Sequence, residues 1–121
     1  MSVALLTADL MLGSQVVGAA ARVGEQLRAF ATIDQLCEAL AAAPASLVIV
    51  DLSLPGLDVS GLISRLHVLP HGSPRTLAFG SHVHVDRLAA ARTAGCDRVV
   101  SRGQFHAQVD EFLAAAAKPT D

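Results

Sequence analysis

The sequence contains no tryptophan and no tyrosine, and its aromatic side chains are limited to four phenylalanines. Charged residues make up only 17% of the 121 positions, and the net charge is −2 because nine Lys and Arg stand against eleven Asp and Glu. Nucleic-acid-binding surfaces usually combine a basic excess with stacking aromatic rings. We therefore expect that this chain does not bind nucleic acid.

Cysteines and long apolar runs are also few. Cys37 and Cys96 are far apart and show no CxxC spacing, which favours free, mostly buried thiols in a cytosolic protein. Apolar runs such as Ser46 to Val50 have the length of a strand, well short of the ~20 residues that a membrane span needs. The first six residues lack the basic segment of a signal peptide. The expected location is therefore the cytoplasm, with no membrane contact.

What the sequence does contain is a regular alternation of strand-like and helix-like segments. With 52% hydrophobic residues, a chain of this size can bury the core of a single domain over residues 1–121. Strands are predicted over 3–7, 25–31, 47–51, 76–79 and 97–101, and helices over 10–23, 33–43, 59–67, 84–94 and 105–116. Residues 118–121 are expected to fray.

Five βα units in succession predict an α/β fold. Right-handed crossovers place the helices on both faces of a parallel sheet, which gives three layers. We expect a five-stranded sheet in the order 2-1-3-4-5, with two helices on one face and three on the other. The expected core includes Val48 and Ile49 of the third strand. It also includes five residues on helix faces, namely Val16, Leu36, Leu88, Val109 and Phe112.

Two motifs at strand ends point to a family. Asp51 ends the third strand and is followed by Leu-Ser-Leu-Pro-Gly-Leu-Asp over residues 52–58, and Ala-Gly-Cys-Asp over residues 94–97 precedes the fifth strand. Together with the spacing of the elements, these motifs resemble the response-regulator receiver (CheY-like) domains over almost the whole chain. The resemblance implies a flavodoxin-like (βα)5 fold, a role in two-component signal transduction, and Asp51 at the phosphoacceptor position.

The resemblance also implies a phosphorylation pocket, which is degenerate in this sequence. A working receiver carries an acidic pair after the first strand, because Mg²⁺ needs several oxygen ligands beside the phosphoacceptor. It also has a hydroxyl after the fourth strand and a lysine after the fifth. The corresponding positions here are Thr7 and Ala8 for the acidic pair, with Asp9 one residue further on, Gly80 or Ser81 for the hydroxyl, and Arg102 for the lysine. The pattern therefore resembles a pseudo-receiver.

Several consequences follow for Asp51. Arg102 can pair with this carboxylate and replace the charge of a metal ion, or Asp51 can accept from backbone amides of the following loop. Phosphorylation is then absent or very slow, and Mg²⁺ is a cofactor only if Asp51 is a functional phosphoacceptor. Two alternatives stay open, namely a phosphoacceptor receiver that uses Asp51 in a phosphorelay and a flavodoxin-like domain that binds a small molecule or a metal.

We expect the chain to act through protein contacts or self-association. The resemblance implies a surface formed by the fourth helix, the fifth strand and the fifth helix. The residues predicted to contribute are Arg87, Ala91, Arg92, Arg98 and Gln108. Small alanines would let another backbone approach, with the guanidinium groups at the rim. The alternative is that these alanines only favour helix formation.

The histidine positions do not predict a metal site. His82, His84 and His106 follow the fourth strand or open the last helix, but no third ligand accompanies the His-x-His pair, so we predict exposed histidines and no metal site. The sequence has no phosphate-binding glycine loop and no arrangement of nucleophile and base that spacing can justify. We therefore expect that the protein is not an enzyme.

Overall fold

The computed structural model describes residues 2–116, which form five strands and five helices in strict alternation. The strands are β1 (Ser2–Leu6), β2 (Gln26–Phe30), β3 (Leu47–Asp51), β4 (Arg75–Gly80) and β5 (Arg98–Ser101). The helices are α1 (Leu10–Arg22), α2 (Ile33–Ala42), α3 (Val59–His67), α4 (Val85–Ala94) and α5 (Arg102–Ala116). The predicted fraying of residues 118–121 lies outside the described residues.

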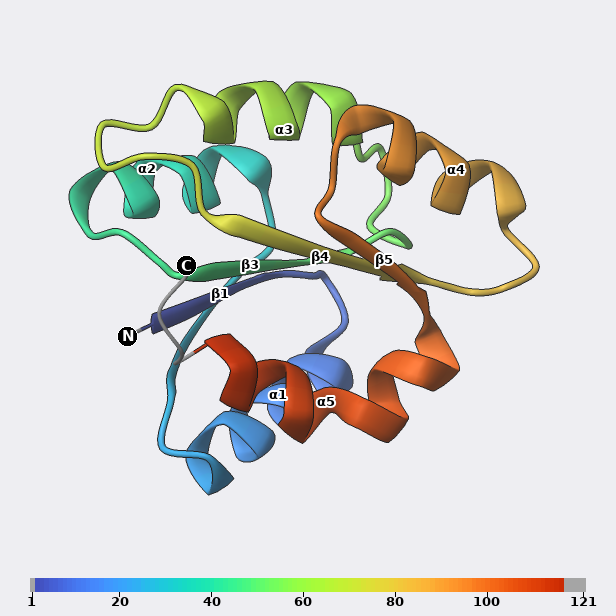
Figure 1. The fold of residues 1–121 in the computed structure, drawn as a ribbon, viewed down its shortest axis with the longest axis horizontal. Helices are drawn as coiled ribbons and strands as arrows, with labels where there is room; N and C mark the ends of the chain where they lie inside the picture. The colour runs from blue at the N-terminus through green and yellow to red at the C-terminus, as the bar shows by residue number, and fades with distance from the viewer. Residues whose placement is uncertain (1, 117–121) are drawn as a thin grey trace.

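The sheet has the predicted order, β2-β1-β3-β4-β5, and all four strand pairings are parallel. Figure 1 shows α1 and α5 on one face and α2, α3 and α4 on the other. This two-and-three division is the one expected from right-handed crossovers. Because the strands are parallel, their carboxyl ends meet at one edge of the sheet, where Thr7, Asp51, Ser81 and Arg102 follow or end four of them.

The core lies on both faces of the sheet. Alternate residues of β1 and β3 point to opposite faces, so Leu5 and Ile49 pack against α1 and α5, whereas Leu6 and Val50 pack against α2, α3 and α4. All five residues of β3 are buried, as the continuous apolar run predicted for a strand covered on both sides.

The predicted helix-face residues are buried with two exceptions. Val16, Leu36 and Leu88 lie in the core as predicted. Val109 and Phe112 are only half-buried, so the prediction that they are buried was wrong. The cause lies in α5, whose backbone is non-helical at Gln108 and whose buried side chains are instead Phe105, Leu113 and Ala116.

The turn before β5 is held by one glycine and one carboxylate. Gly95 ends α4 with a left-handed φ of 102°, a conformation that glycine adopts without a steric cost. An Asp97 carboxylate oxygen then accepts hydrogen bonds from both the backbone amide (2.8 Å) and the hydroxyl (3.1 Å) of Thr76, at the beginning of β4. The motif that resembled the receiver turn therefore ties the start of β5 to its neighbouring strand.

None of the helices within residues 2–116 combines the length and the apolar character that crossing a membrane would require.

Candidate functional site: the hydrogen-bond network of Asp51

Asp51 is the last residue of β3, and only 1% of its surface is exposed. A buried carboxylate is tolerated only when it is paired and hydrogen-bonded, because its charge has lost the solvation of water. The side chains that meet this requirement come from three other places in the chain, namely the end of β1, the β3–α3 loop and the start of α5.

Thr7 supplies the partner from β1. Its Oγ1 donates a hydrogen bond of 2.6 Å to Oδ2 of Asp51, and the same oxygen accepts one of 3.1 Å from the backbone amide of Asp9. Thr7 is at the position where the resemblance to receivers implies a carboxylate, and it offers a neutral hydroxyl there. The hydroxyl satisfies Asp51 without adding negative charge.

Ser53 and Arg102 occupy the other carboxylate oxygen. The Ser53 amide and hydroxyl donate to Oδ1 of Asp51 over 3.0 and 2.6 Å. The Arg102 guanidinium lies 3.6 Å from Oδ1 and donates a 3.2 Å hydrogen bond to Oγ of Ser53. Both the ion pair and the loop amide predicted from the sequence are therefore present. Arg102 also lies over the ring of Phe79, which helps to orient it.

This donor set does not suit Mg²⁺. Both oxygens of Asp51 are already engaged, and Thr7 offers a hydroxyl whose proton points to Asp51. Asp9 lies at the N-terminus of α1, where its Oδ1 accepts from the amides of Met11 and Leu12, and Ala8 has no ligand atom. Within residues 2–116, no group of three or more His, Cys, Asp and Glu side chains could hold a metal ion.

Of the two candidates for the receiver hydroxyl, Gly80 lies on the wrong face. Asp51 is paired with Phe79 in the sheet, so Gly80, one residue on, faces α4, and a Cβ there would lie 3.2 Å from Cβ of Leu52. Ser81 follows on the other face, but its Oγ accepts from the amide of Val83 at 3.4 Å. Among the described residues, Ser81 makes no hydrogen bond to Asp51.

The Ser53 hydroxyl is the partner of Asp51 that sequence reasoning missed, whereas a loop amide was predicted. The available signal was local: a carboxylate commonly accepts from the amide two residues later in an Asx turn, and Ser53 is two residues after Asp51. That pattern accounts for the amide contact. The second contact, from the hydroxyl, depends on the rotamer of Ser53 and on Arg102 approaching from α5.

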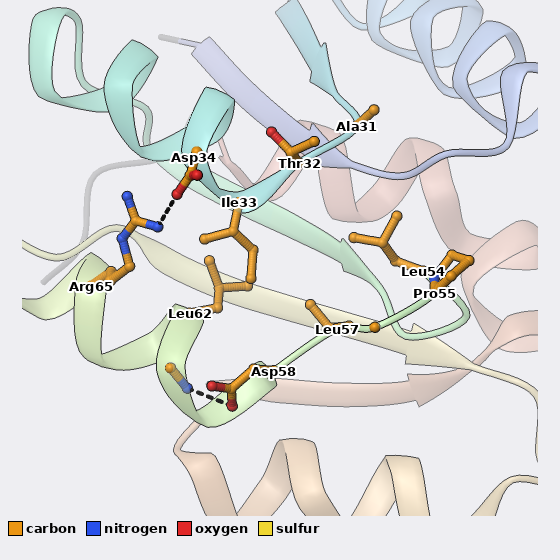
Figure 2. Close-up of a pocket in the computed structure, with 12 residues that line it drawn as sticks. Ala31, Thr32, Ile33, Asp34, Leu54, Pro55, Leu57, Asp58, Leu62 and Arg65 are labelled. Carbon is orange, nitrogen blue, oxygen red and sulfur yellow. Dashed lines mark hydrogen bonds and ion pairs between the residues drawn. The ribbon is translucent and has the colours of Figure 1, made fainter.

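A groove of about 510 Å³ lies beside this network, between the start of α2 and the β3–α3 loop. Figure 2 shows Ile33, Leu54, Leu57 and Leu62 around the groove, with the Asp34–Arg65 ion pair along one side. None of the four residues of the Asp51 network lines it. The groove is open, and its leucines at 54 and 57 are half-exposed, so it does not enclose a ligand as small-molecule sites usually do.

The residues predicted for the partner surface do not form one face. Ala91 is fully buried against the core, so its assignment to an exposed surface is wrong. Arg87 lines a depression with the β3–α3 loop, which places it on the α3 side of α4. Five residues later, and about 140° around the helix, Arg92 is exposed on a different side.

The remaining two predicted surface residues lie at β5 and α5. Arg98 is exposed and its guanidinium lies over the ring of Phe112 on α5, 5.0 Å from the ring centre. Gln108 is half-buried and accepts a hydrogen bond from Gln104. Arg92 on α4 and Arg98 on β5 are therefore exposed, Gln108 on α5 is half-buried, and the surface that they were predicted to form stays a prediction.

The histidines and cysteines lie outside the network. His82, His84 and His106 are exposed. Cys37 is buried and Cys96 is half-buried, and burial raises the pKa of both thiols. A raised pKa keeps a thiol protonated and unreactive near neutral pH, in line with free thiols of structural character.

Comparison with solved structures identifies the fold. The receiver domain of the sensor histidine kinase PA1611 from Pseudomonas aeruginosa, solved with a magnesium ion in its active-site cleft, is 13% identical, has a TM-score of 0.79, and the alignment covers 94% of each chain. A signal receiver domain from Bermanella marisrubri is 19% identical with a TM-score of 0.74, covering 89% of this chain and 97% of that one. The beryllofluoride-activated NtrC4 receiver domain dimer is 12% identical with a TM-score of 0.74, covering 96% and 98%.

The chain thus has the fold of response-regulator receiver domains, as the sequence motifs predicted. No family model matches the sequence, and no curated protein matches it.

Proposed function

We propose that this protein is a receiver-like signalling module that acts through protein contacts and in which Asp51 is not a phosphoacceptor. The observation that carries the proposal is the burial of Asp51 with both carboxylate oxygens engaged by Thr7, Ser53 and Arg102. A phosphoryl donor would have to displace these partners before it could reach the carboxylate. Arg102 supplies the positive charge that a metal ion would otherwise provide.

The receiver fold supports the signalling role, since its solved examples include a response regulator and the receiver of a sensor kinase. Turnover of a substrate is not part of the proposal, because Asp51 is paired with Arg102 and none of the four network residues lines the neighbouring groove. Mg²⁺ is not required, because the ligands that would hold it are replaced by Thr7 and Ala8.

Phosphorylation chemistry tests this proposal directly. The purified protein is incubated with acetyl phosphate and Mg²⁺, and its intact mass is measured before and after hydroxylamine, which cleaves acyl phosphates but leaves phosphate esters. We expect no hydroxylamine-sensitive gain of a phosphoryl group. A sensitive gain that is absent from Asp51→Asn would overturn the proposal and restore the phosphorelay alternative.

For the partner surface, we propose the side of the molecule formed by α4, β5 and α5, with Arg92 and Arg98 at its rim. The NtrC4 receiver forms a dimer, which supports self-association as the contact made by this side. Arg92→Glu combined with Arg98→Glu should then weaken association measured by analytical ultracentrifugation. The matched variant is Arg87→Glu on the α3 side of α4, which should leave association unchanged. If Arg87→Glu weakened association as much as the double change, the proposed surface would be wrong.

A further inference from the structure

We infer that Ser53 is a phosphoryl-accepting residue and that its phosphorylation opens the Asp51 network. The inference rests on the proposed function in one respect: Asp51 is taken to be engaged and not itself an acceptor. It assigns a modification site to a hydroxyl that neither the sequence motifs nor the receiver fold singles out.

Accessibility distinguishes the two candidate nucleophiles. Asp51 is 1% exposed, whereas Ser53 is exposed at the carboxyl edge of the sheet. Ser53 Oγ donates a 2.6 Å hydrogen bond to Oδ1 of Asp51, so the exposed serine and the buried carboxylate are in direct contact. A phosphoryl donor that approaches the site therefore meets the serine before the aspartate.

The neighbours of Ser53 supply what phosphoryl transfer to a hydroxyl needs. A serine is a weak nucleophile until a base accepts its proton, and the Asp51 carboxylate already accepts the hydrogen bond of that proton. The Arg102 guanidinium, 3.2 Å from Oγ and with 35% of its side chain exposed, can bind the oxygens of an incoming phosphoryl group. Arg102 is also the first residue of α5, so the positive end of that helix faces the same region.

The proposed step is balanced with an acyl phosphate as the donor. Oγ of Ser53 attacks the phosphorus and forms an ester bond, while the bond from phosphorus to the acyl oxygen breaks and the carboxylate leaves. The hydroxyl proton passes to Asp51 and from there to solvent. No oxidation or reduction takes place, and no metal ligand is required from the protein.

The product would rearrange the site. A phosphoserine carries nearly two negative charges and has lost the hydroxyl proton, so Ser53 can no longer donate to Asp51 and instead repels it. Arg102 would be drawn from the carboxylate to the phosphate. Because Arg102 begins α5, this exchange links the modification to the position of the first turn of that helix.

The test uses acetyl phosphate with the whole protein, followed by intact mass, hydroxylamine treatment and fragmentation to locate the phosphate. We expect a hydroxylamine-resistant phosphoryl group on Ser53 that is absent from Ser53→Ala and retained in Ser60→Ala, an exposed serine nearby in α3. The labelling rate should fall by about tenfold or more in Asp51→Asn and Arg102→Gln, given the usual contribution of a positioned base. Arg102→Lys, which keeps the charge, should label faster than Arg102→Gln.

The possible failures are distinguishable. No mass gain, or a resistant phosphate that persists in Ser53→Ala, overturns the Ser53 inference and leaves the proposed function standing. A hydroxylamine-sensitive phosphate that is lost in Asp51→Asn overturns both. If Ser53 were labelled at the same rate in wild type and in Asp51→Asn, the proposed role of Asp51 as the base would be wrong. Far-ultraviolet circular dichroism of each variant separates these results from loss of the fold.

Discussion

The two sides of the sheet at its carboxyl edge are built in different ways. On the face covered by α1 and α5, polar side chains are joined into a closed network of Thr7, Asp51, Ser53 and Arg102. On the opposite face of the sheet, beside β4, packing takes the place of hydrogen bonds, since the space that a side chain at Gly80 would take is filled by Leu52. One side therefore depends on satisfied hydrogen bonds and the other on shape, and each should respond to a different kind of substitution.

The largest effect is expected from removing the centre of the polar side. Asp51→Ala leaves the buried Thr7 hydroxyl without its acceptor and Arg102 without its counter-charge, so we expect a loss of about 3 kcal/mol in the free energy of unfolding. Urea denaturation measures it. Asp58→Ala, which removes the exposed N-cap carboxylate of α3, should cost about 1 kcal/mol. Equal losses in the two variants would mean that the network contributes nothing beyond an ordinary cap.

Introducing an acidic pair at positions 7 and 8 should convert the polar side into a metal site. Thr7→Asp with Ala8→Asp replaces a donor by a carboxylate beside the buried Asp51, and we expect a loss of about 2 kcal/mol without metal because like charges meet. Mg²⁺ should recover much of this loss, since a ligand that binds only the folded state stabilises it. Thermal unfolding with MgCl₂ or EDTA measures both effects, and Ala8→Asp alone, at an exposed position, should respond weakly. A double variant insensitive to Mg²⁺ would show that Arg102 prevents metal binding.

The packed side is tested at Gly80. In Gly80→Val, the new Cβ would lie 3.2 Å from Cβ of Leu52 and 3.6 Å from Cδ2 of Leu88, so overpacking should cost about 1–2 kcal/mol. Gly103→Ala is the matched change, because a Cβ there meets nothing within 4 Å, and it should be neutral or stabilising in a helix. If Gly80→Val were as stable as wild type, the β4 side would be loosely packed and the contrast between the two sides would fail.

The smallest expected effect isolates one hydrogen bond. Thr7→Val keeps the shape of the side chain but removes the hydroxyl that donates to Asp51, and we expect a loss of about 1 kcal/mol. Thr93→Val, on the exposed side of α4, provides the control and should change stability far less. Chemical denaturation of both proteins gives the difference. If the free energy of unfolding fell no more in Thr7→Val than in Thr93→Val, the Thr7 hydrogen bond would contribute nothing, and Asp51 would be stabilised by Ser53 and Arg102 alone.

Most of the fold follows from local patterns in the sequence. The apolar run of β3 predicted a strand buried on both faces, and the carboxyl ends of parallel strands necessarily share one edge of the sheet. Asp51 and Arg102 stand at this edge, and the resemblance to receivers pointed to these two positions, so their pairing could be predicted. Helix faces were harder, because a 3.6-residue period assumes a continuous helix. The interruption at Gln108 turns Val109 and Phe112 partly outward.

The sequence by itself determined the order of the elements, the parallel sheet and the edge at which the polar residues gather, because these depend on periodicity and on the handedness of crossovers. Only the tertiary structure decided which of those residues touch. Thr7 and Asp51 are 44 positions apart, and Ser53 and Arg102 are 49 apart, so their contacts depend on strand register, rotamers and the entry of α5. The same applies to Ala91, whose burial depends on how α4 is rotated against the sheet, a choice that its alanine-rich sequence leaves open.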